Sequence, residues 1–271
     1  MNYRHVFHAG NFADVAKHLA LLGVLQHLRK KDGGFAVIDS HAGRGSYDLG
    51  GPEAMRTGEA ADGIIRLTKA SLSGDLPPLL ADYLALARGP VYPGSPLLAA
   101  KMLRPQDRLV AVEKHPEDAA ALAQVLQPYA KARVEQGDGY KRVTALLPPP
   151  ERRGAVLMDP PFEAPDEFQA AAQAITKAYR RFATGIYLIW FPIKSAAEAN
   201  GFCGEVLASG AAKVLRIDVA KRGVAAGKLA AAGVLVINPP WQLDDELRLA
   251  LDLAMPRLDA EAKIEWLVGA V

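Results

Sequence analysis

The stretch VLMDPPFEAP (156–165) places one acid, two prolines and an aromatic ring directly after an apolar run. Neither proline can donate a backbone hydrogen bond, so the motif fits neither a helix interior nor the middle of a central strand. We therefore expect a buried strand that ends here and holds Asp159 and Phe162 rigidly at its tip. An amino group on an aromatic base is a poor nucleophile, because its lone pair is delocalised into the ring. Its methylation needs acceptors for the N–H bonds, and the Asp159 carboxylate and Pro160 carbonyl would supply two. Phe162 would stack on the target base after that base has been turned out of its own nucleic-acid helix.

Other polar residues follow predicted strands. In an open parallel sheet, ligands bind at the carboxyl ends of the strands near the switch point. The turn HAGRG (41–45) after Asp39 allows a ligand to approach the backbone closely. Glu113 is placed to accept hydrogen bonds from two ribose hydroxyls, and Asp138 to accept one from an adenine amino group. A plain tight turn and solvated strand ends are the alternative interpretations. Asp48 stands where a dinucleotide fingerprint has its third glycine, which disfavours a nicotinamide enzyme.

A second copy of the signature, NPPW (238–241), has the same four-residue form. It follows the last predicted strand, whereas the catalytic tip should close the strand after the one that ends at Asp138. Asp159 lies 21 residues beyond Asp138, and Asn238 lies far outside that interval. We therefore expect Asn238 to Trp241 to form a strand-end turn with a packed tryptophan.

The elements that must position these residues alternate along the chain. Seven short β-branched and apolar runs predict strands at 35–40, 109–115, 132–139, 155–161, 185–192, 212–220 and 233–240. Ala- and Leu-rich segments between them, such as 117–129 and 166–182, predict helices. This alternation indicates a doubly wound α/β fold with a mostly parallel sheet, covered on both faces. The last two strands are joined by a segment with little helical pattern, which indicates an antiparallel pair.

Two further segments complete the predicted architecture. Residues 11–31 form a helix with Asn11 as its N-cap and Asp14 in its first turn. Between the first and second strands lie about twice the residues that one crossing helix requires. We interpret 48–92 as a small inserted helical subdomain, within one domain that spans 1–271.

Composition limits the classes of function. The formal net charge is +2, and basic clusters at 28–31, 151–153, 177–182 and 220–223 are either solvated faces or parts of a phosphate-contacting strip. Cys203 is the single cysteine, which excludes an internal disulfide and fits a reducing compartment. The longest apolar run, IYLIWFPI, is too short to span a bilayer. We therefore expect a cytoplasmic protein without a membrane partner. Three histidines near the N-terminus, His5, His8 and His18, could suggest a metal site. The sequence has no Cys-x-x-Cys motif and no acid cluster to accompany them, so we expect no metal.

Four strings of this sequence carry a family resemblance. The DPPF motif, in this order with the other strand-end residues, resembles the adenine-N6 class of S-adenosyl-L-methionine-dependent methyltransferases. YRHVFHAGNFADVAKH (3–18), DSHAGRGSYDLG (39–50), YPGSPLL (92–98) and DPPF (159–162) are similar to bacterial 23S rRNA adenine-N6 methyltransferases of the J type, the RlmJ family. The similarity runs from Tyr3 to about Trp241.

The resemblance implies a Rossmann-like fold, S-adenosyl-L-methionine as methyl donor, and transfer to one adenine of 23S rRNA, adenine 2030. The RNA is expected to be protein-free or in an early assembly intermediate, and the enzyme monomeric. Asp159 is the implied catalytic residue. The implied cofactor contacts are His18, His41, Ser95, Glu113, Asp138, Gly139 and Asp159. The expected substrate contacts are Tyr3, His5, Pro160 and Phe162. Many relatives carry Tyr where this chain has Phe162, so a hydroxyl contact is lost there.

Three alternatives remain open at this point. DNA adenine-N6 and protein glutamine methyltransferases share the signature, although the insertion is small for a DNA-reading domain. A non-catalytic RNA-binding module for ribosome assembly could use the same fold, but the intact Asp159, Glu113 and Asp138 argue against it.

Overall fold

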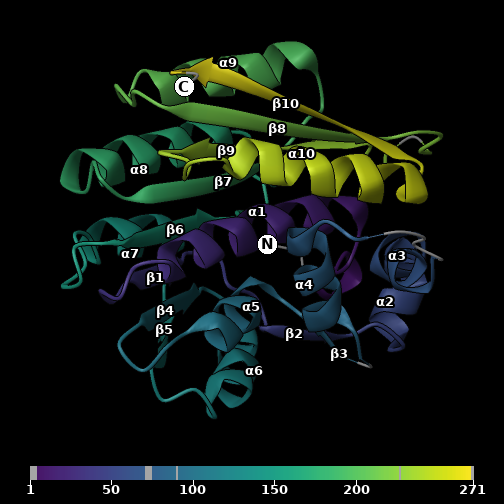
Figure 1. Ribbon diagram of the computed structural model, residues 1–271, viewed down its shortest axis with the longest axis horizontal. Helices are drawn as coiled ribbons and strands as arrows, with labels where there is room; N and C mark the ends of the chain where they lie inside the picture. Colours follow the sequence, from purple (N-terminus) through teal and green to yellow (C-terminus); the bar gives the residue numbers. More distant parts are fainter. Residues whose placement is uncertain (1–4, 71–74, 90, 226, 270–271) are drawn as a thin grey trace.

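The computed structural model describes residues 5–70, 75–89, 91–225 and 227–269. Within them, a main sheet of eight strands has the order β10-β8-β9-β7-β6-β1-β4-β5 (Figure 1). The strands are β1 Ala36–Asp39, β4 Arg108–Glu113, β5 Ala132–Gln136, β6 Gly154–Met158, β7 Ile186–Pro192, β8 Val214–Lys221, β9 Ala231–Ile237 and β10 Ala260–Val268. All seven predicted strands are present, and the α/β prediction is confirmed.

Strands β1, β4, β5, β6 and β7 run parallel, with β1 between β4 and β6. The chain builds outward from β1 through β4 to β5, then returns to the other side of β1 for β6 and β7. The switch point therefore lies between β1 and β6, and the carboxyl ends of all five strands share one edge. This is the edge where open α/β sheets bind ligands.

The other side of the sheet is antiparallel. Strand β9 runs against β7, β8 against β9, and β10 against β8. The predicted antiparallel pair β8–β9 is thus confirmed. Strand β10 was not predicted, because its sequence AEAKIEWLV alternates charged and apolar residues along a half-covered edge and forms no continuous apolar run.

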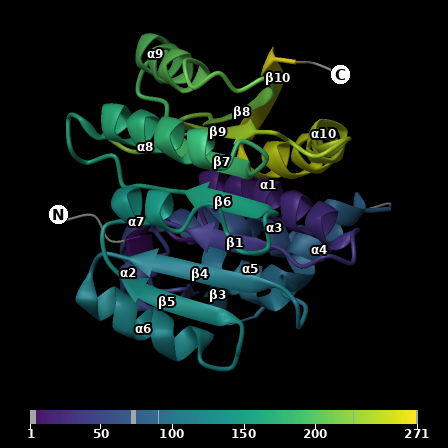
Figure 2. The ribbon, with the colours of Figure 1, turned by 90° about the vertical axis from the view of Figure 1, so that its left-hand side faces the viewer.

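Helices cover both faces of the sheet (Figure 2). Helices α1 (Phe12–Arg29), α5 (Ser95–Met102), α6 (Pro116–Leu126) and α10 (Leu243–Ala254) contribute to the core on one face. Helices α7 (Gly139–Ala145), α8 (Glu167–Arg181) and α9 (Ala196–Leu207) contribute to the core on the other. Helix α1 begins as predicted, since the side chain of Asn11 accepts a hydrogen bond from the backbone N–H of Asp14. No helix in the described parts of the chain is long and apolar enough to cross a membrane.

The segment 48–92 contains the expected helices: α2 (Pro52–Thr57), a short π-helical turn η2 (Ala61–Ile65), α3 (Arg66–Lys69) and α4 (Pro78–Ala87). An antiparallel ribbon of β2 (Ser46–Asp48) and β3 (Val91–Pro93), which was not predicted, closes its base. Leu67, Leu80 and Tyr83 of this segment are buried in the same core as α1. Its status as a separate subdomain stays a prediction.

The Asn-Pro-Pro-Trp motif (238–241) lies at the opposite edge of the sheet from Asp159, because β9 runs against β7. The side-chain amide of Asn238 donates to the carbonyls of Ala183 and Gly185, both at 2.8 Å. The motif is a strand-end turn, as expected, but the prediction of a packed tryptophan was wrong. Trp241 is 64% exposed, and Leu243 at the start of α10 fills the core instead.

Candidate active site

A cavity opens at the carboxyl ends of β1, β4, β5 and β6, and we call it the central cavity. Its empty space, mouth included, is about 860 Å³. All seven predicted cofactor contacts line it: His18, His41, Ser95, Glu113, Asp138, Gly139 and Asp159. The fold therefore brings together residues from six separate segments. Their contact with a cofactor stays a prediction.

Two glycines allow the wall of the central cavity to form. Gly43 has a φ of +60°, and a Cβ there would lie 2.4 Å from the hydroxyl oxygen of Tyr47. A Cβ on Gly139 would lie 2.0 Å from the carbonyl oxygen of Ser40. Only glycine fits either position. The close approach at Gly139 lets the loop after β1 and the start of α7 form neighbouring parts of the wall.

The two predicted acids are held by backbone groups. Glu113 accepts hydrogen bonds from the N–H of Gly43 and the N–H of His115, each at 2.8 Å and each on a different oxygen. Asp138 caps α7, with its Oδ1 accepting from the N–H of Lys141 at 3.2 Å. Carboxylate oxygens accept more than one hydrogen bond. Both acids therefore keep fixed acceptor capacity toward hydroxyl or amino groups of a ligand.

His18 is oriented by two tyrosines that sequence reasoning did not identify. Its Nδ1 lies 2.8 Å from the hydroxyl of Tyr92, which lies 2.9 Å from the hydroxyl of Tyr83. Burial lowers the pKa of His18 to about 3, so the ring is neutral. In one order of donation, Tyr83 donates to Tyr92 and Tyr92 donates to Nδ1 of His18, so both hydroxyl protons are used. In the reverse order, His18 donates to Tyr92 and Tyr92 to Tyr83, which leaves the buried hydroxyl proton of Tyr83 without an acceptor.

This polarity places the imidazole proton on Nε2. That atom is buried and has no hydrogen-bond partner among the described residues, and His18 lines the central cavity. We infer that His18 presents an N–H donor to an acceptor group of the ligand.

Of the remaining predicted contacts, Ser95 is buried and His41 is half-buried. Ser95 donates to Asp39 at 2.7 Å, and burial raises the pKa of Asp39 to about 7. The ring of His41 packs edge-on against Tyr140, with centroids 4.8 Å apart. Burial lowers the pKa of His41 to about 4. Two neutral imidazoles and a serine hydroxyl thus line the cavity beside the acids.

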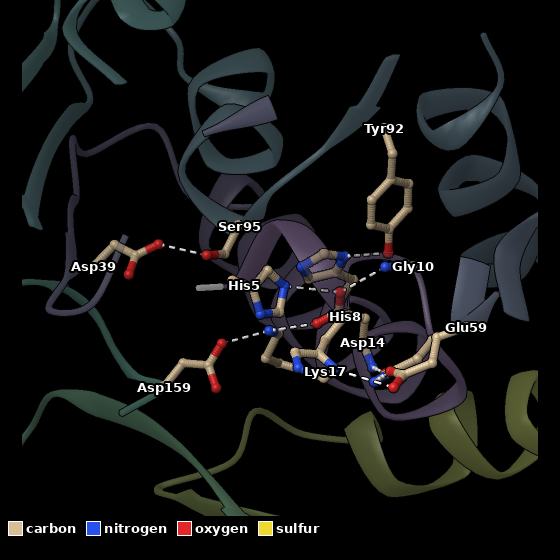
Figure 3. A network of polar contacts seen from close by, with 12 residues as sticks. His5, His8, Gly10, Asp14, Lys17, Asp39, Glu59, Tyr92, Ser95 and Asp159 are labelled. Carbon is tan, nitrogen blue, oxygen red and sulfur yellow. Dashed lines mark hydrogen bonds and ion pairs between the residues drawn. The ribbon is translucent and has the colours of Figure 1, made fainter. Parts of the chain in front are cut away.

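The central feature of the site is an ion pair that the sequence analysis missed (Figure 3). The ammonium nitrogen of Lys17 lies 2.5 Å from Oδ2 of Asp159 and 2.6 Å from Oδ1 of Asp14. Oδ2 of Asp14 accepts from the N–H of Gly10 at 2.8 Å and lies 3.0 Å from Nε2 of His5. Oδ1 of Asp159 has no hydrogen-bond partner among the described residues. The catalytic candidate is thus held by one oxygen and presents the other.

Electrostatics keep this network charged. Burial disfavours the ammonium of Lys17, but the carboxylates of Asp14 and Asp159 outweigh it and raise the pKa of Lys17 above its usual value. Burial likewise opposes ionisation of Asp14, yet His5 and Lys17 hold its pKa well below the usual value. A signal for this pair existed in the sequence, because Asp14 and Lys17 are spaced i, i+3 in the mostly apolar first half of α1.

A second hollow adjoins the network, and we call it the side pocket. It shares His5, Lys17, Asp159 and Pro161 with the central cavity, and its empty space is about 600 Å³. Of the predicted substrate contacts, His5 lines both hollows and Phe162 lines the side pocket. Pro160 is buried at the strand tip. Tyr3 lies outside the described residues.

Phe162 is more enclosed than its predicted role suggests. It is 5% exposed, and its ring packs against Phe168, Trp190 and Phe202 with centroids 4.6, 6.0 and 6.2 Å apart. Its φ of +50° is rare for a bulky residue, and such strained backbone is often found at functional sites. Stacking of Phe162 on a base stays a prediction.

Glu167 supports the same loop. Its two carboxylate oxygens accept from the N–H of Ala164 and the hydroxyl of Tyr140, each at 3.2 Å. The loop after Asp159 is thereby tied to α7 and α8.

In the part of the chain that the structure describes, no three His, Cys, Asp or Glu side chains are grouped as metal ligands.

Comparisons with known proteins show what this chain is similar to. A family model described as "Ribosomal RNA large subunit methyltransferase D, RlmJ" matches residues 32–268. A protein of Escherichia coli K12 named ribosomal RNA large subunit methyltransferase J is 39% identical, over 99% of this chain and 99% of that protein. A protein of the same name from Haemophilus influenzae is 38% identical, over 99% and 98%. A crystal structure of a Legionella pneumophila protein superposes with a TM-score of 0.88 at 32% identity, covering 95% of this chain and 98% of that one.

We expect Lys17→Met to destabilise the fold strongly. The substitution leaves two buried carboxylates without their shared cation, and breaking a buried ion pair costs about 3–5 kcal/mol. Urea unfolding measures the change, with Lys177→Met on the exposed face of α8 as the control, for which we expect less than about 0.5 kcal/mol. A Lys17→Met protein as stable as the parent would show that the ion pair does not hold this site together.

We expect Tyr92→Phe to weaken binding of S-adenosylhomocysteine about 2- to 10-fold, the range of one net hydrogen bond. Without the hydroxyl, nothing fixes the proton of His18 on Nε2. Calorimetry measures the affinity, and nitrogen NMR of His18 reports the tautomer. Tyr187→Phe is the matched control, since it removes a buried hydroxyl that donates to Ala178 and Phe182, away from the cavity. An Nδ1–H tautomer in the parent would refute the assignment.

Proposed function

Because this chain belongs to the RlmJ family of ribosomal RNA large subunit methyltransferases, we propose that it methylates the N6 amino group of one adenine of 23S rRNA. It is an S-adenosyl-L-methionine-dependent enzyme. The observation that carries the proposal is the position of Asp159. This carboxylate lies at a strand tip between two hollows, with one oxygen fixed by Lys17.

The residues of the central cavity fit S-adenosyl-L-methionine, which supplies an electrophilic methyl group when bound. The unpartnered Nε2–H of His18 suits its carboxylate. Glu113 suits the ribose hydroxyls, and Asp138 the amino group of its adenine. The cavity wall around Gly43 admits a ligand close to the backbone.

The side pocket suits the target base. It lies against Asp159 and Pro161, and its walls include Phe162, Trp190 and Pro192. A base that enters it must leave its stack and unpair, as bases do in other enzymes that act on nucleobases. Its amino group can then donate to Asp159 Oδ1 and to the carbonyl of Pro160. Both acceptors are fixed before the base arrives, so little reorganisation is needed as the nitrogen gains positive charge.

Asp159 acts at the reacting nitrogen, and Lys17 acts through Asp159. The ammonium group fixes the carboxylate in one rotamer, with Oδ1 left for the substrate. Proximity and alignment in the two adjoining hollows then contribute a large part of the rate.

The finer features of partner and location are proposals as well. A flipped base requires a strand that is free to open, and ribosomal proteins restrict such opening. We therefore propose that the substrate is protein-free rRNA or an early assembly intermediate. We also propose that the enzyme works as a monomer, since the central cavity and side pocket are built from one chain. Its proposed location is the cytoplasm.

We expect labelled S-adenosyl-L-methionine to mark protein-free 23S rRNA faster than assembled large subunits. Nucleoside analysis of the labelled rRNA should yield N6-methyladenosine. DNA and ribosomal protein incubated in parallel serve as controls and should stay unlabelled. Label in a different nucleoside would contradict the proposed chemistry, and faster labelling of intact subunits would contradict the proposed substrate.

A further inference from the structure

A third hollow adjoins the side pocket, and we call it the outer groove. This groove lies between the N-terminal segment 5–8, helix α2 and the loop before β9, and its empty space is about 890 Å³. It shares His8 and Leu229 with the side pocket. The side pocket in turn shares Lys17 and Asp159 with the central cavity. The three hollows therefore adjoin one another in a row that starts at the catalytic carboxylate, and we call this row the path.

Three exposed cations line this path. Lys194 follows β7 and lines the side pocket, while Arg56 in α2 and Lys228 in the loop before β9 line the outer groove. They come from segments that are distant in sequence. None of the three forms an ion pair with a carboxylate of the described residues.

Neighbouring cations outside the path are neutralised. Lys221 lies 3.4 Å from Asp62, and Arg222 lies 3.2 Å from Glu261. Arg66 is likewise paired, with Asp259. These three cations are thus paired with acids, whereas the three that line the path are not.

The one acid that lines the outer groove among the described residues is already engaged by hydrogen bonds. One carboxylate oxygen of Glu59 lies 2.9 Å from Nδ1 of His8, and the other accepts from the side-chain amide of Asn11 at 3.0 Å (Figure 3). Glu59 thereby ties the turn after α2 to the N-terminal segment and to the start of α1. A ligand in the outer groove meets two cations and no free carboxylate among the described residues.

We propose that the outer groove binds the phosphodiester backbone of the RNA strand next to the target nucleotide, with Arg56, Lys194 and Lys228 as its phosphate contacts. The inference rests on the proposed function. A base held in the side pocket must have its sugar and phosphates on the open side of that pocket, where Lys194 and the outer groove lie. Phosphate contacts of this kind fix the register of the strand without reading its sequence.

The test is a triple variant, Arg56→Gln, Lys194→Gln and Lys228→Gln, in the full-length enzyme. The control has the same loss of charge: Lys131→Gln, Lys177→Gln and Lys213→Gln. Lys131 and Lys213 precede strands at the edge of the sheet opposite the site, and Lys177 lies in the second half of α8. All six side chains are exposed, so folding should be unaffected.

Filter binding to transcribed, protein-free 23S rRNA over a range of salt concentrations is the measurement. Each phosphate contact on a single strand contributes about 0.7 to the slope of log K against log salt. The groove variant should lose about 2 from this slope and bind roughly 100-fold more weakly near 0.1 M salt. Equal losses in both triple variants, or an unchanged slope, would overturn the inference.

Calorimetry with S-adenosylhomocysteine separates the two levels of the argument. All variants should bind it like the parent, which shows an intact central cavity. If the parent methylates 23S rRNA and the groove variant binds RNA like the control, the inference about the outer groove fails and the proposed function stands. If the parent neither binds nor methylates 23S rRNA, the proposed function fails first, and the inference falls with it.

Discussion

The ammonium group of Lys17 is the constraint on which the site depends. It lies between the carboxylates of Asp14 and Asp159, and none of these three side chains is more than 14% exposed. Charges removed from water are tolerated only with close partners and further hydrogen bonds. Helix α1 and the tip of β6 must therefore keep one relative position. The same requirement reaches the N-terminal segment, because the second oxygen of Asp14 holds Gly10 and His5. One buried cation thus aligns the catalytic carboxylate, the first helix and the segment before it.

Strand direction decides what an Asn/Asp-Pro-Pro-aromatic tip can do. At Asp159 the tip closes a parallel strand beside the switch point, where the central cavity and the side pocket meet. At Asn238 nearly the same four residues close an antiparallel strand, so they emerge at the opposite edge. There the side chain is used to bind two carbonyl groups, and the ring of Trp241 is exposed. The stiffness of two prolines is common to both tips, and the topology alone gives one of them a pocket on each side.

Much of this site was predictable because parallel strands bring their carboxyl ends to one edge. The acids Glu113, Asp138 and Asp159 could be assigned to one cavity from their positions after strands, and the cap at Asn11 from local chemistry. The features that escaped prediction depend on contacts between distant segments. The pairing of Lys17 with Asp159, and of Tyr92 with His18, joins residues that no local pattern relates. The remaining missed elements are strands with weak local patterns. The alternating charged and apolar residues of β10 are typical of a polar segment, and β2 and β3 are only three residues long each.

The central claim is that the carboxylate of Asp159 acts at the reacting nitrogen, and the turnover of Asp159→Ala tests it most directly. The measurement is kcat for labelled methyl transfer to protein-free 23S rRNA at saturating substrates, with thermal unfolding to verify the fold. Asn238→Gly is the matched control, since glycine accepts the positive φ of that position. The account predicts a loss of about 10²–10³ for Asp159→Ala, the usual effect of removing one preorganised group, and a rate near that of the parent for Asn238→Gly. Near-normal turnover by folded Asp159→Ala, or loss of activity on changing Asn238 alone, would contradict it.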